Sequence, residues 1–366
     1  MKRLLFINNA QFGYHTDSYI YCLYLGEDRD VTYLCWDYGL ERVEAENINV
    51  IYVSRSGNKV KRLWRFIHRA LEEMNADRSR IAFIVYFRLC SLLKWFGKCE
   101  HIILDIRTGY VLKSRVKGIL HNFGIGFESM FFERVTVITE ELRQMLGIPA
   151  KKSHILPLGA EPMQFAEKDF AEMRLIYVGT FNNRDITKTI EGFDRFVDAH
   201  NGSIKSHYDI IGFGTPEEEH RIHDAIGRSS HRDRMTFHGR IPHKRLHPYL
   251  SASNVGVAFV PIVSYQQPQP YTKVFEYLLA GMPVLATANA TNKKVINDSN
   301  GILVKDTAAD FERGLEVMKT RLRTYNSATI KHDARKYSWA EIIDENLRPY
   351  LARLEGGGRA CLTRRT

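Results

Sequence analysis

Short apolar runs alternate with longer amphipathic stretches along nearly the whole chain. A strand buried in a parallel sheet appears as a short apolar run, whereas a helix appears as an amphipathic stretch. The alternation therefore predicts parallel strands connected by helices. Strands are expected in the first half at residues 3–8, 30–36, 50–53, 101–105 and 135–139, and in the second half at 174–178, 208–211, 235–237, 255–260, 284–286 and 302–304.

One segment interrupts this alternation. Residues 155–162 contain two prolines and a glycine, which favour a linker over a strand or helix. The predicted fold class is therefore α/β, with two tandem Rossmann-like domains at residues 1–157 and 158–335. The fold alone does not specify an activity.

The end of the chain departs from the strand and helix alternation. Ser338 and Glu341 have the spacing of a capping box, which predicts an amphipathic helix over residues 336–354. Residues 355–366 contain three consecutive glycines and several arginines, so we expect a disordered basic tail.

Composition narrows the class of protein. The 366 residues suit two domains, and a net charge of +10 favours an anionic partner. The five cysteines have no zinc-binding spacing, so a reduced, cytoplasmic protein is expected. The longest apolar run, residues 81–96, contains two basic residues and is too short to cross a bilayer, and the N-terminus indicates a strand rather than a signal peptide.

The most informative segment is residues 271–287, where a polar stretch leads into a short helix, a Gly-Met-Pro turn and a buried strand. The start of a helix attracts anions, so Thr272 and Lys273 lie where a phosphate would bind. Glu276 has two interpretations at this stage. It either complements the helix dipole or accepts the hydroxyls of a ribose.

This segment resembles the donor-site signature of the GT-B glycosyltransferases, particularly the large retaining family four (glycosyltransferase group 1) of bacterial polysaccharide biosynthesis. The other segments that resemble it, in the same order, are 175–184, 208–214, 237–250, 300–304 and 337–339. The resemblance covers nearly all of the second half and the first half only in outline. It implies two Rossmann-like domains that face each other across a cleft, with a C-terminal helix that returns to the first domain.

The resemblance implies roles for several residues. Arg184 and Lys273 would stabilise the leaving diphosphate, although each is also consistent with an ordinary surface charge. Glu276 would bind the ribose. The remaining implied donor-binding residues are the backbone around Arg240 and Ile241 for the base, and Gly179, Gly212 and Gly214 for close approach of the main chain.

The sequence departs from the family pattern at one position. Pro268 stands where members commonly carry the first of two glutamates, so contacts to the sugar would come from Gln267, Gln269 or backbone N–H groups.

In the first domain the resemblance places Asp105 and Arg107 on the acceptor side, and Gly13 in a loop that approaches the diphosphate. The alternative interpretation of Asp105 and Arg107 is a strand-end carboxylate and a loop charge.

No metal or other cofactor is expected besides the nucleotide-sugar co-substrate. Asp28 and Asp30 flank Arg29 in an Asp-x-Asp pattern, but they precede a strand as a turn would. His243 and His247 have helical spacing without the glutamate of a zinc protease, so they are interpreted as surface residues.

Residues 59–98, which we call the basic arm, contain ten Lys or Arg residues and three acidic residues. A helix over 61–74 would have an apolar and a basic face. The aromatic and apolar residues that follow, interleaved with cations, suit an anionic membrane surface, and the alternative is an ordinary surface helix. Those aromatic and apolar residues are Phe83, Tyr86, Phe87, Leu93, Trp95 and Phe96.

The sequence thus predicts a retaining, metal-independent glycosyltransferase that moves a sugar from a nucleotide-sugar to a glycan or polyprenyl-linked acceptor. Cell-surface polysaccharide or lipopolysaccharide assembly, at the inner face of the cytoplasmic membrane, is the expected setting. No nucleic-acid partner is expected, because the basic arm has no accompanying recognition motif. Two alternatives remain open at this stage, a non-catalytic scaffold of the same fold and a nucleotide-sugar epimerase.

Overall fold

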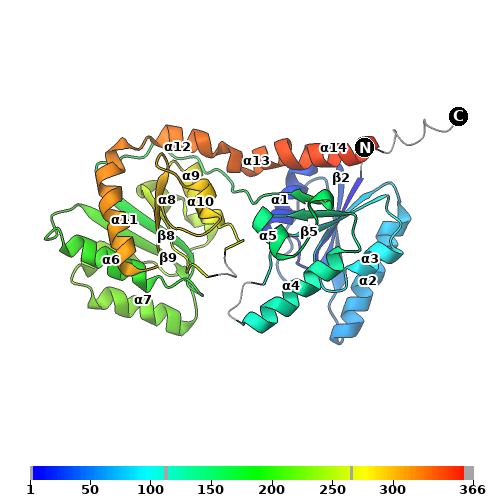
Figure 1. Ribbon diagram of the computed structural model, residues 1–366. Helices are drawn as coiled ribbons and strands as arrows, with labels where there is room; N and C mark the ends of the chain where they lie inside the picture. Colours follow the sequence, from blue (N-terminus) through cyan, green and yellow to red (C-terminus); the bar gives the residue numbers. More distant parts are fainter. Residues whose placement is uncertain (1–2, 111–113, 264–266, 358–366) are drawn as a thin grey trace. The chain divides into compact units, whose positions relative to one another are not determined.

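The structure is a computed structural model that describes residues 3–110, 114–263 and 267–357. The chain forms two compact units (Figure 1). Unit 1 comprises Met1–Leu158 together with Trp339–Thr366, and unit 2 comprises Gly159–Ser338. Each unit has its own parallel sheet with helices on both sides, as the α/β pattern predicts.

Unit 1 contains a seven-stranded sheet in the order β3-β2-β1-β4-β5-β6-β7, and every neighbouring pair is parallel. The chain order reverses between β1 and β4, as in Rossmann-type sheets. The strands are β1 (Arg3–Ile7), β2 (Asp30–Asp37), β3 (Ile48–Ser54), β4 (Ile81–Val85), β5 (His101–Ile106), β6 (Arg134–Val137) and β7 (Ser153–Ile155).

Strand β4 corrects part of the interpretation of the basic arm. It pairs with both β1 and β5, and all five of its residues are buried. Phe83, Phe87 and Leu93 are therefore core side chains rather than groups that face a membrane. A continuous apolar run of five residues fits a central strand, but next to arginines and aromatics it also fits an interfacial segment. Strand β7 is the other strand that the pattern does not reveal.

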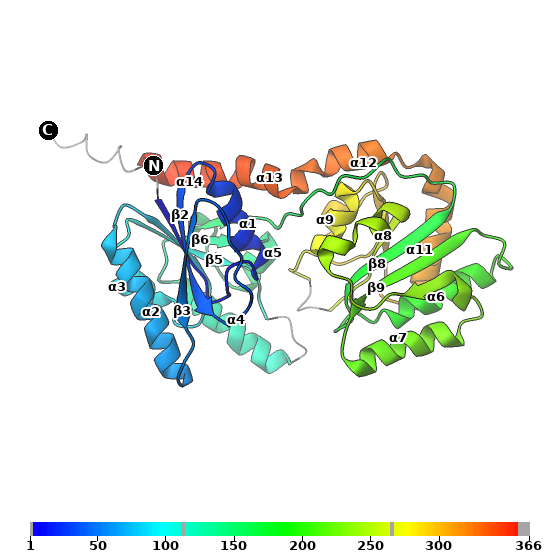
Figure 2. The same ribbon diagram turned by 180° about the vertical axis from the view of Figure 1, so that it is seen from behind.

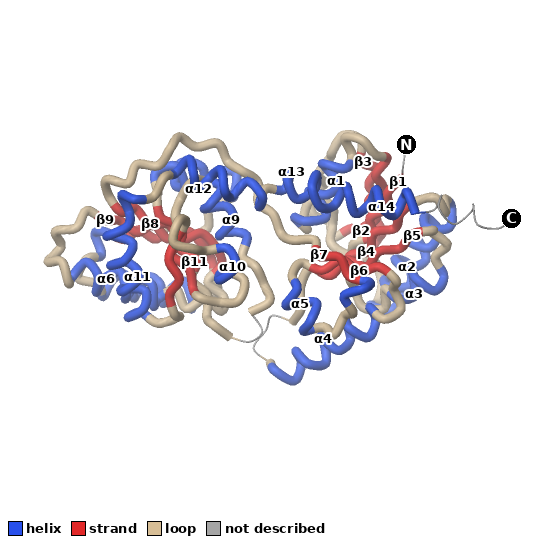
Figure 3. Tube along the Cα trace, turned by 45° about the horizontal axis from the view of Figure 1, so that its top comes forward, coloured by secondary structure: helices blue, strands red, loops and turns tan. Residues whose placement is uncertain are grey.

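Helices cover both faces of the unit 1 sheet. The helices α2 (Lys59–Ala76), α3 (Ser91–Phe96), α4 (Arg115–Ser129) and α5 (Glu140–Met145) contribute to one apolar core. Helix α1 (Thr16–Leu25) and the C-terminal helical segments pack in the other core (Figure 3).

The C-terminal segment runs through α13 (Trp339–Ile342), a π-helical turn (Ile343–Leu347) and α14 (Arg348–Gly357). Trp339 is buried in the unit 1 core and meets the Tyr21 ring edge-on, with centroids 5.7 Å apart. The expected tail from residue 355 is wrong for its first residues, because α14 continues to Gly357. Glu355 forms an ion pair with the guanidinium of Arg29, which holds this last turn against unit 1. The rest of the expected tail lies outside the described residues.

Unit 2 repeats the same topology with six parallel strands in the order β10-β9-β8-β11-β12-β13. The strands are β8 (Met173–Thr180), β9 (Ser206–Phe213), β10 (Met235–Phe237), β11 (Val255–Ala258), β12 (Val284–Thr287) and β13 (Gly301–Val304). The helices are α6 (Thr187–Asp198), α7 (Pro216–Arg228), α8 (His247–Ala252), α9 (Thr272–Leu279), α10 (Asn292–Val295), α11 (Ala308–Arg321) and α12 (Ser327–Ala334) (Figure 2).

Within the described parts of the chain, no helix has both the length and the apolar character to cross a membrane.

Replacing Trp339 tests how the C-terminal helix stabilises unit 1. Trp339→Ala removes a fully buried indole, so the free energy of unfolding should fall by about 3–5 kcal/mol. Scanning calorimetry should show the unfolding transition of unit 1 lowered by roughly 10 °C. Trp64→Ala is the matched control, because this side chain is 61% exposed and its loss should change stability by less than about 0.5 kcal/mol. Equal effects of the two substitutions would contradict the packing described here.

Candidate functional site

The candidate site lies in unit 2, at the carboxyl ends of the central strands. The strand order reverses between β8 and β11, and ligands of open α/β sheets bind outside the strand ends at such a switch point. Gly179 lies near the end of β8 with a φ of +153°, a conformation that favours glycine. A Cβ atom at this position would lie 2.7 Å from the amine nitrogen of Lys273. Glycine therefore suits this backbone conformation and leaves space for the Lys273 amine.

Helix α9 is held tightly against the sheet. The Tyr277 hydroxyl accepts a hydrogen bond from the backbone N–H of Val178, at 2.9 Å. The Tyr277 ring packs over Gly256 of β11, where a Cβ atom would come within 2.3 Å of the ring. These contacts fix the helix that carries Lys273 and Glu276 relative to the ends of β8 and β11.

Lys273 is a cation in an environment that opposes its charge. Its ammonium group lies 3.9 Å from the centre of the Tyr177 ring. Burial and, to a smaller extent, the positive charge of Arg184 lower the pKa of Lys273 to about 7, while Glu276 acts in the opposite direction. An anion bound here would restore the charged form of the lysine.

Arg184 is the second cation of the site, on the loop that follows β8. It lies between Asn183 and Asp185, which have positive φ angles of 56° and 50°. Its Nη1 donates to the carbonyl oxygens of Asn182 and Asn183, at 3.4 and 3.2 Å. Its guanidinium carbon lies 5.4 Å from the centre of the Tyr271 ring. Two cations from separate elements are thus close enough to influence each other, as an anion-binding site requires.

Glu276 lies one turn further along α9 than Lys273. Burial raises its pKa, while the neighbouring His243 and Lys273 favour its charged form. The His243 ring nitrogen Nε2 lies 3.9 Å from a carboxylate oxygen of Glu276. The His243 side chain is 60% exposed, in line with its interpretation as a surface residue. The fold also brings it beside Glu276, which the sequence does not indicate because the two residues belong to different elements.

Three further predicted donor-binding residues of unit 2 lie at the same end of this sheet. Arg240 is exposed, and its guanidinium carbon lies 4.6 Å from the centre of the Phe213 ring at the end of β9. Ile241 is half-buried in the loop after β10, and Thr272 is exposed at the first position of α9. The first N–H groups of a helix have no partner within the helix, so Thr272 opens a segment that favours an anion.

The glycines at the end of β9 have structural explanations of their own. A Cβ atom at Gly212 would lie 2.1 Å from the carbonyl oxygen of Gly179 on β8. One at Gly214 would lie 2.6 Å from a carboxylate oxygen of Glu218. Both glycines are therefore needed for packing within unit 2, whether or not a ligand is bound.

The two glutamines expected to contact a sugar are engaged within the protein, Gln267 through its side chain and Gln269 through its backbone. The Gln267 side-chain oxygen accepts a hydrogen bond from the backbone N–H of Ala290, at 2.7 Å. The Gln269 carbonyl oxygen accepts from the Thr291 hydroxyl, at 3.1 Å, and Pro268 between them is buried. This segment is thus packed against the loop after β12.

In unit 1, Asp105 and Arg107 do not face solvent, and their role at the acceptor stays a prediction. Arg107 is buried and donates to the Asp17 carboxylate, at 2.7 Å, and to the Leu156 carbonyl oxygen, at 2.8 Å. Asp105 is fully buried and accepts from the Thr136 hydroxyl, and burial raises its pKa to about 6. The pair joins β5, β6, α1 and the end of β7. Asp105 lies near the end of β5 and Arg107 follows this strand, as in the alternative interpretation, but both side chains are buried.

Gly13 also has an explanation within unit 1. Its φ is +89°, and a Cβ atom would come within 2.5 Å of the Val43 side chain. The loop after β1 therefore needs a glycine to pack against the loop after β2.

The side chains of the Asp-x-Asp pattern form ion pairs with three different residues. Asp28, Arg29 and Asp30 form ion pairs with Arg348, Glu355 and Arg3, respectively. The described residues include no group of three or more His, Cys, Asp or Glu side chains that could hold a metal ion.

Comparison with known proteins identifies related folds. Residues 172–318 match the family model described as "Glycosyl transferases group 1". Sucrose-phosphate synthase from Thermosynechococcus elongatus is 17% identical, with a TM-score of 0.71 over 98% of this chain and 100% of that chain. Anabaena HepE, solved with UDP and glucose, is 10% identical, with a TM-score of 0.73 over 96% of this chain and 100% of that chain.

The lipopolysaccharide outer core galactosyltransferase WaaB is 12% identical, with a TM-score of 0.70 over 94% of this chain and 97% of that chain. A search of curated protein sequences finds no match. At these identities the solved structures establish only the shared two-domain fold. The family model identifies unit 2 as a glycosyltransferase group 1 domain.

The low pKa of Lys273 predicts pH-dependent anion binding. An anion favours the charged lysine, and raising the pH from 6 to 8 removes most of that charge from the free protein. Between pH 6 and pH 8, the affinity of the wild type for inorganic pyrophosphate should therefore fall about tenfold more than the affinity of Lys273→Arg, because the arginine keeps its charge. Isothermal titration across this pH range measures the difference, and the arginine variant corrects for titration of pyrophosphate itself. Parallel pH profiles for the two proteins would rule out this role for Lys273.

Proposed function

We propose that this chain is a retaining glycosyltransferase with a nucleotide-sugar donor. The premise is that unit 2 matches the glycosyltransferase group 1 family model and that the chain has a GT-B fold. The observation that carries the proposal is the convergence of Lys273 and Arg184 at the end of β8, with Glu276 one turn further along α9. Unit 2 binds the donor in this proposal, and unit 1 binds the acceptor.

The diphosphate of the donor is the group that the two cations suit. As the bond between the sugar and the diphosphate breaks, negative charge grows on the leaving group, and fixed cations stabilise it more than they stabilise the intact donor. The positive groups that stabilise the leaving diphosphate are Lys273, Arg184 and the first N–H groups of α9, so the proposed reaction uses no metal ion. Glu276 accepts the hydroxyls of the ribose, and backbone groups around Arg240 and Ile241 contact the base.

A retaining reaction does not need a dedicated side-chain base in this arrangement. The leaving phosphate is basic and lies on the same face of the sugar as the incoming acceptor hydroxyl, so it can take the acceptor's proton. The burial of Asp105 is consistent with this proposal, because its carboxylate is not exposed to remove a proton from an acceptor.

We propose a glycan or lipid-linked glycan as the acceptor, in the assembly of a cell-surface polysaccharide. HepE was solved with UDP and glucose, and WaaB is named for the lipopolysaccharide outer core, so a UDP-sugar is the first donor to test. Contact with an anionic membrane surface through the basic arm accompanies this proposal. Each exposed cation near such a surface contributes about 1 kcal/mol.

Substitution of the two cations tests the proposed mechanism. Lys273→Ala and Arg184→Ala should each lower kcat by at least about 100-fold, because each removes charge that stabilises the transition state. Transfer of radiolabelled sugar from the donor to an extracted lipid-linked acceptor measures this loss. Lys319→Ala, which removes an exposed cation of α11, is the control and should retain full activity. Unchanged turnover in both cation variants would refute the assignment.

Donor binding tests the role of Glu276 separately. Saturation-transfer NMR with UDP-, GDP- and dTDP-sugars should show one nucleotide class bound, and Glu276→Ala should abolish its ribose signals. Asp298→Ala is the control, because this carboxylate is 92% exposed on another surface of unit 2. Binding that yields an isomerised sugar instead of a glycoside would favour an epimerase, and binding without any product would favour a non-catalytic scaffold.

A further inference from the structure

Helix α4 of unit 1 has an apolar face that points away from its own core. Its inward face packs through Ile125, which is fully buried, and through Glu128 and Ser129. The opposite face carries large apolar side chains that are 47–72% exposed. These are Val116, Ile119, Leu120, Phe123, Phe127 and Met130, which we call the α4 face.

The spacing of these residues shows that they form one continuous surface. Positions 116, 120, 123, 127 and 130 are separated by four and three residues alternately, which places them along one side of a helix. Surface helices of globular proteins usually have charged or polar side chains at these outward positions. A contiguous exposed apolar patch of this kind indicates an interaction site.

An aromatic row extends the α4 face onto α3. Phe123 stacks on Phe127, Phe127 meets Phe131 edge-on, and Phe131 meets Trp95 edge-on, with centroid distances of 6.3, 5.4 and 4.9 Å. Trp95 and the next residue, Phe96, are 58% and 59% exposed. Aromatic side chains are the residues that proteins concentrate at the boundary between lipid and water.

A buried carboxylate holds the two helices together. Glu128 of α4 accepts hydrogen bonds from the backbone N–H groups of Leu89 and Ser91, at 2.9 and 3.1 Å, where α3 begins. Glu128 is also the only acidic residue between positions 114 and 130. The α4 face therefore has no acidic side chain of its own among these residues.

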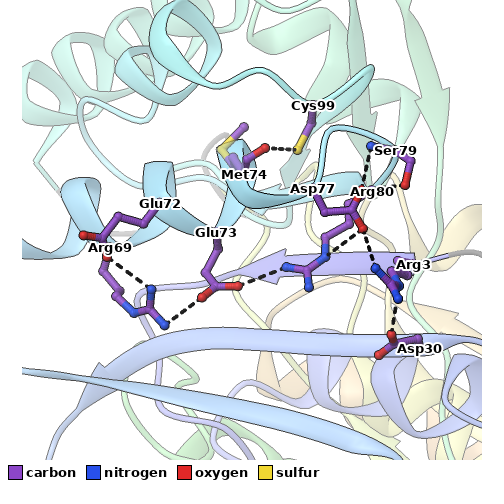
Figure 4. A network of polar contacts seen from close by, with 10 residues as sticks. All are labelled: Arg3, Asp30, Arg69, Glu72, Glu73, Met74, Asp77, Ser79, Arg80 and Cys99. Atoms are coloured by element: carbon purple, nitrogen blue, oxygen red, sulfur yellow. Dashed lines mark hydrogen bonds and ion pairs between the residues drawn. The ribbon is translucent and has the colours of Figure 1, made fainter.

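The charge around the α4 face is positive. Helices α2, α3 and α4 lie on the same side of the unit 1 sheet (Figures 1 and 2). The basic arm contacts the α4 region directly, because Leu89 and Ser91 donate to Glu128 and Trp95 meets Phe131. The acids of the arm are engaged by arginines: Arg69 and Arg80 contact Glu73, and Arg3 and Arg80 contact Asp77 (Figure 4). The exposed cations of the basic arm and of α4 include Lys59, Lys61, Arg65, Arg88, Lys98 and Lys117.

We propose that the α4 face, together with Trp95 and Phe96, inserts into an anionic lipid bilayer, while the cations of the basic arm contact the lipid headgroups. An apolar strip with aromatic side chains, flanked by cations, has the composition of an interfacial helix. A second copy of the chain fits less well, because a symmetric contact would bring two basic arms of the same charge together. This inference deepens the membrane contact of the proposed function by naming the element that enters the lipid.

Vesicle flotation of the full chain tests the proposal. The wild-type protein should float with vesicles of phosphatidylethanolamine and phosphatidylglycerol, and bind phosphatidylcholine vesicles much more weakly. Leu120→Gln/Phe123→Gln should reduce partitioning by more than about 100-fold, because two inserted apolar side chains are lost without any change in charge. Val317→Gln is the matched control, because this exposed apolar residue lies on α11 in unit 2 and should leave binding unchanged.

Unaltered flotation of the double variant, or failure of the wild type to bind the anionic vesicles, would overturn the proposal. Sedimentation equilibrium gives a third such outcome, in which the wild type is a dimer and the double variant is a monomer. Pyrophosphate affinity and circular dichroism of the double variant should match the wild type, which shows that its fold is intact. Donor binding and sugar transfer are measured on the same preparations. A protein that floats but does not transfer sugar would refute the proposed function and leave this inference standing.

Discussion

The candidate site depends on how closely helix α9 approaches the central strands of unit 2. Gly256 permits this approach beneath the Tyr277 ring, and Gly179 leaves space for the Lys273 amine. The Tyr277 hydroxyl then completes the attachment by accepting a hydrogen bond from β8. A larger side chain at either glycine would move the helix or the lysine, so the position of the cation is set by backbone packing.

The consequence of this packing is a lysine whose charge is costly in the free protein. Burial and the neighbouring Arg184 both oppose the ammonium form, and the Tyr177 ring face and Glu276 compensate in part. A bound diphosphate would relieve this cost and gain two charge-assisted contacts. In the proposed function, the site is thus organised for an anion before the donor binds, which suits a transfer reaction with an anionic leaving group.

Unit 1 uses the same residue types for different purposes. Its acidic and basic side chains at the end of β5 are buried in a network that joins α1, β6 and the segment after β7. Its apolar surplus lies outside, on α4 and α3, next to the basic arm. The two units therefore share a topology but differ in their notable surfaces, with the two cations of the candidate site at strand ends in unit 2 and an apolar surface on a helix in unit 1.

The amino-acid sequence by itself determined the two α/β series, most strand positions and the donor-site motif. Hydrophobic periodicity is a local property, and the motif around Lys273 and Glu276 lies within six residues of Thr272. Only the tertiary structure decided that β4 is a central strand, that Asp105 and Arg107 are buried, that His243 lies beside Glu276 and that the apolar side of α4 faces outward. The physical reason is that burial and proximity depend on which elements pack together, and a helix with apolar residues on two sides does not indicate from its sequence which side the core will cover.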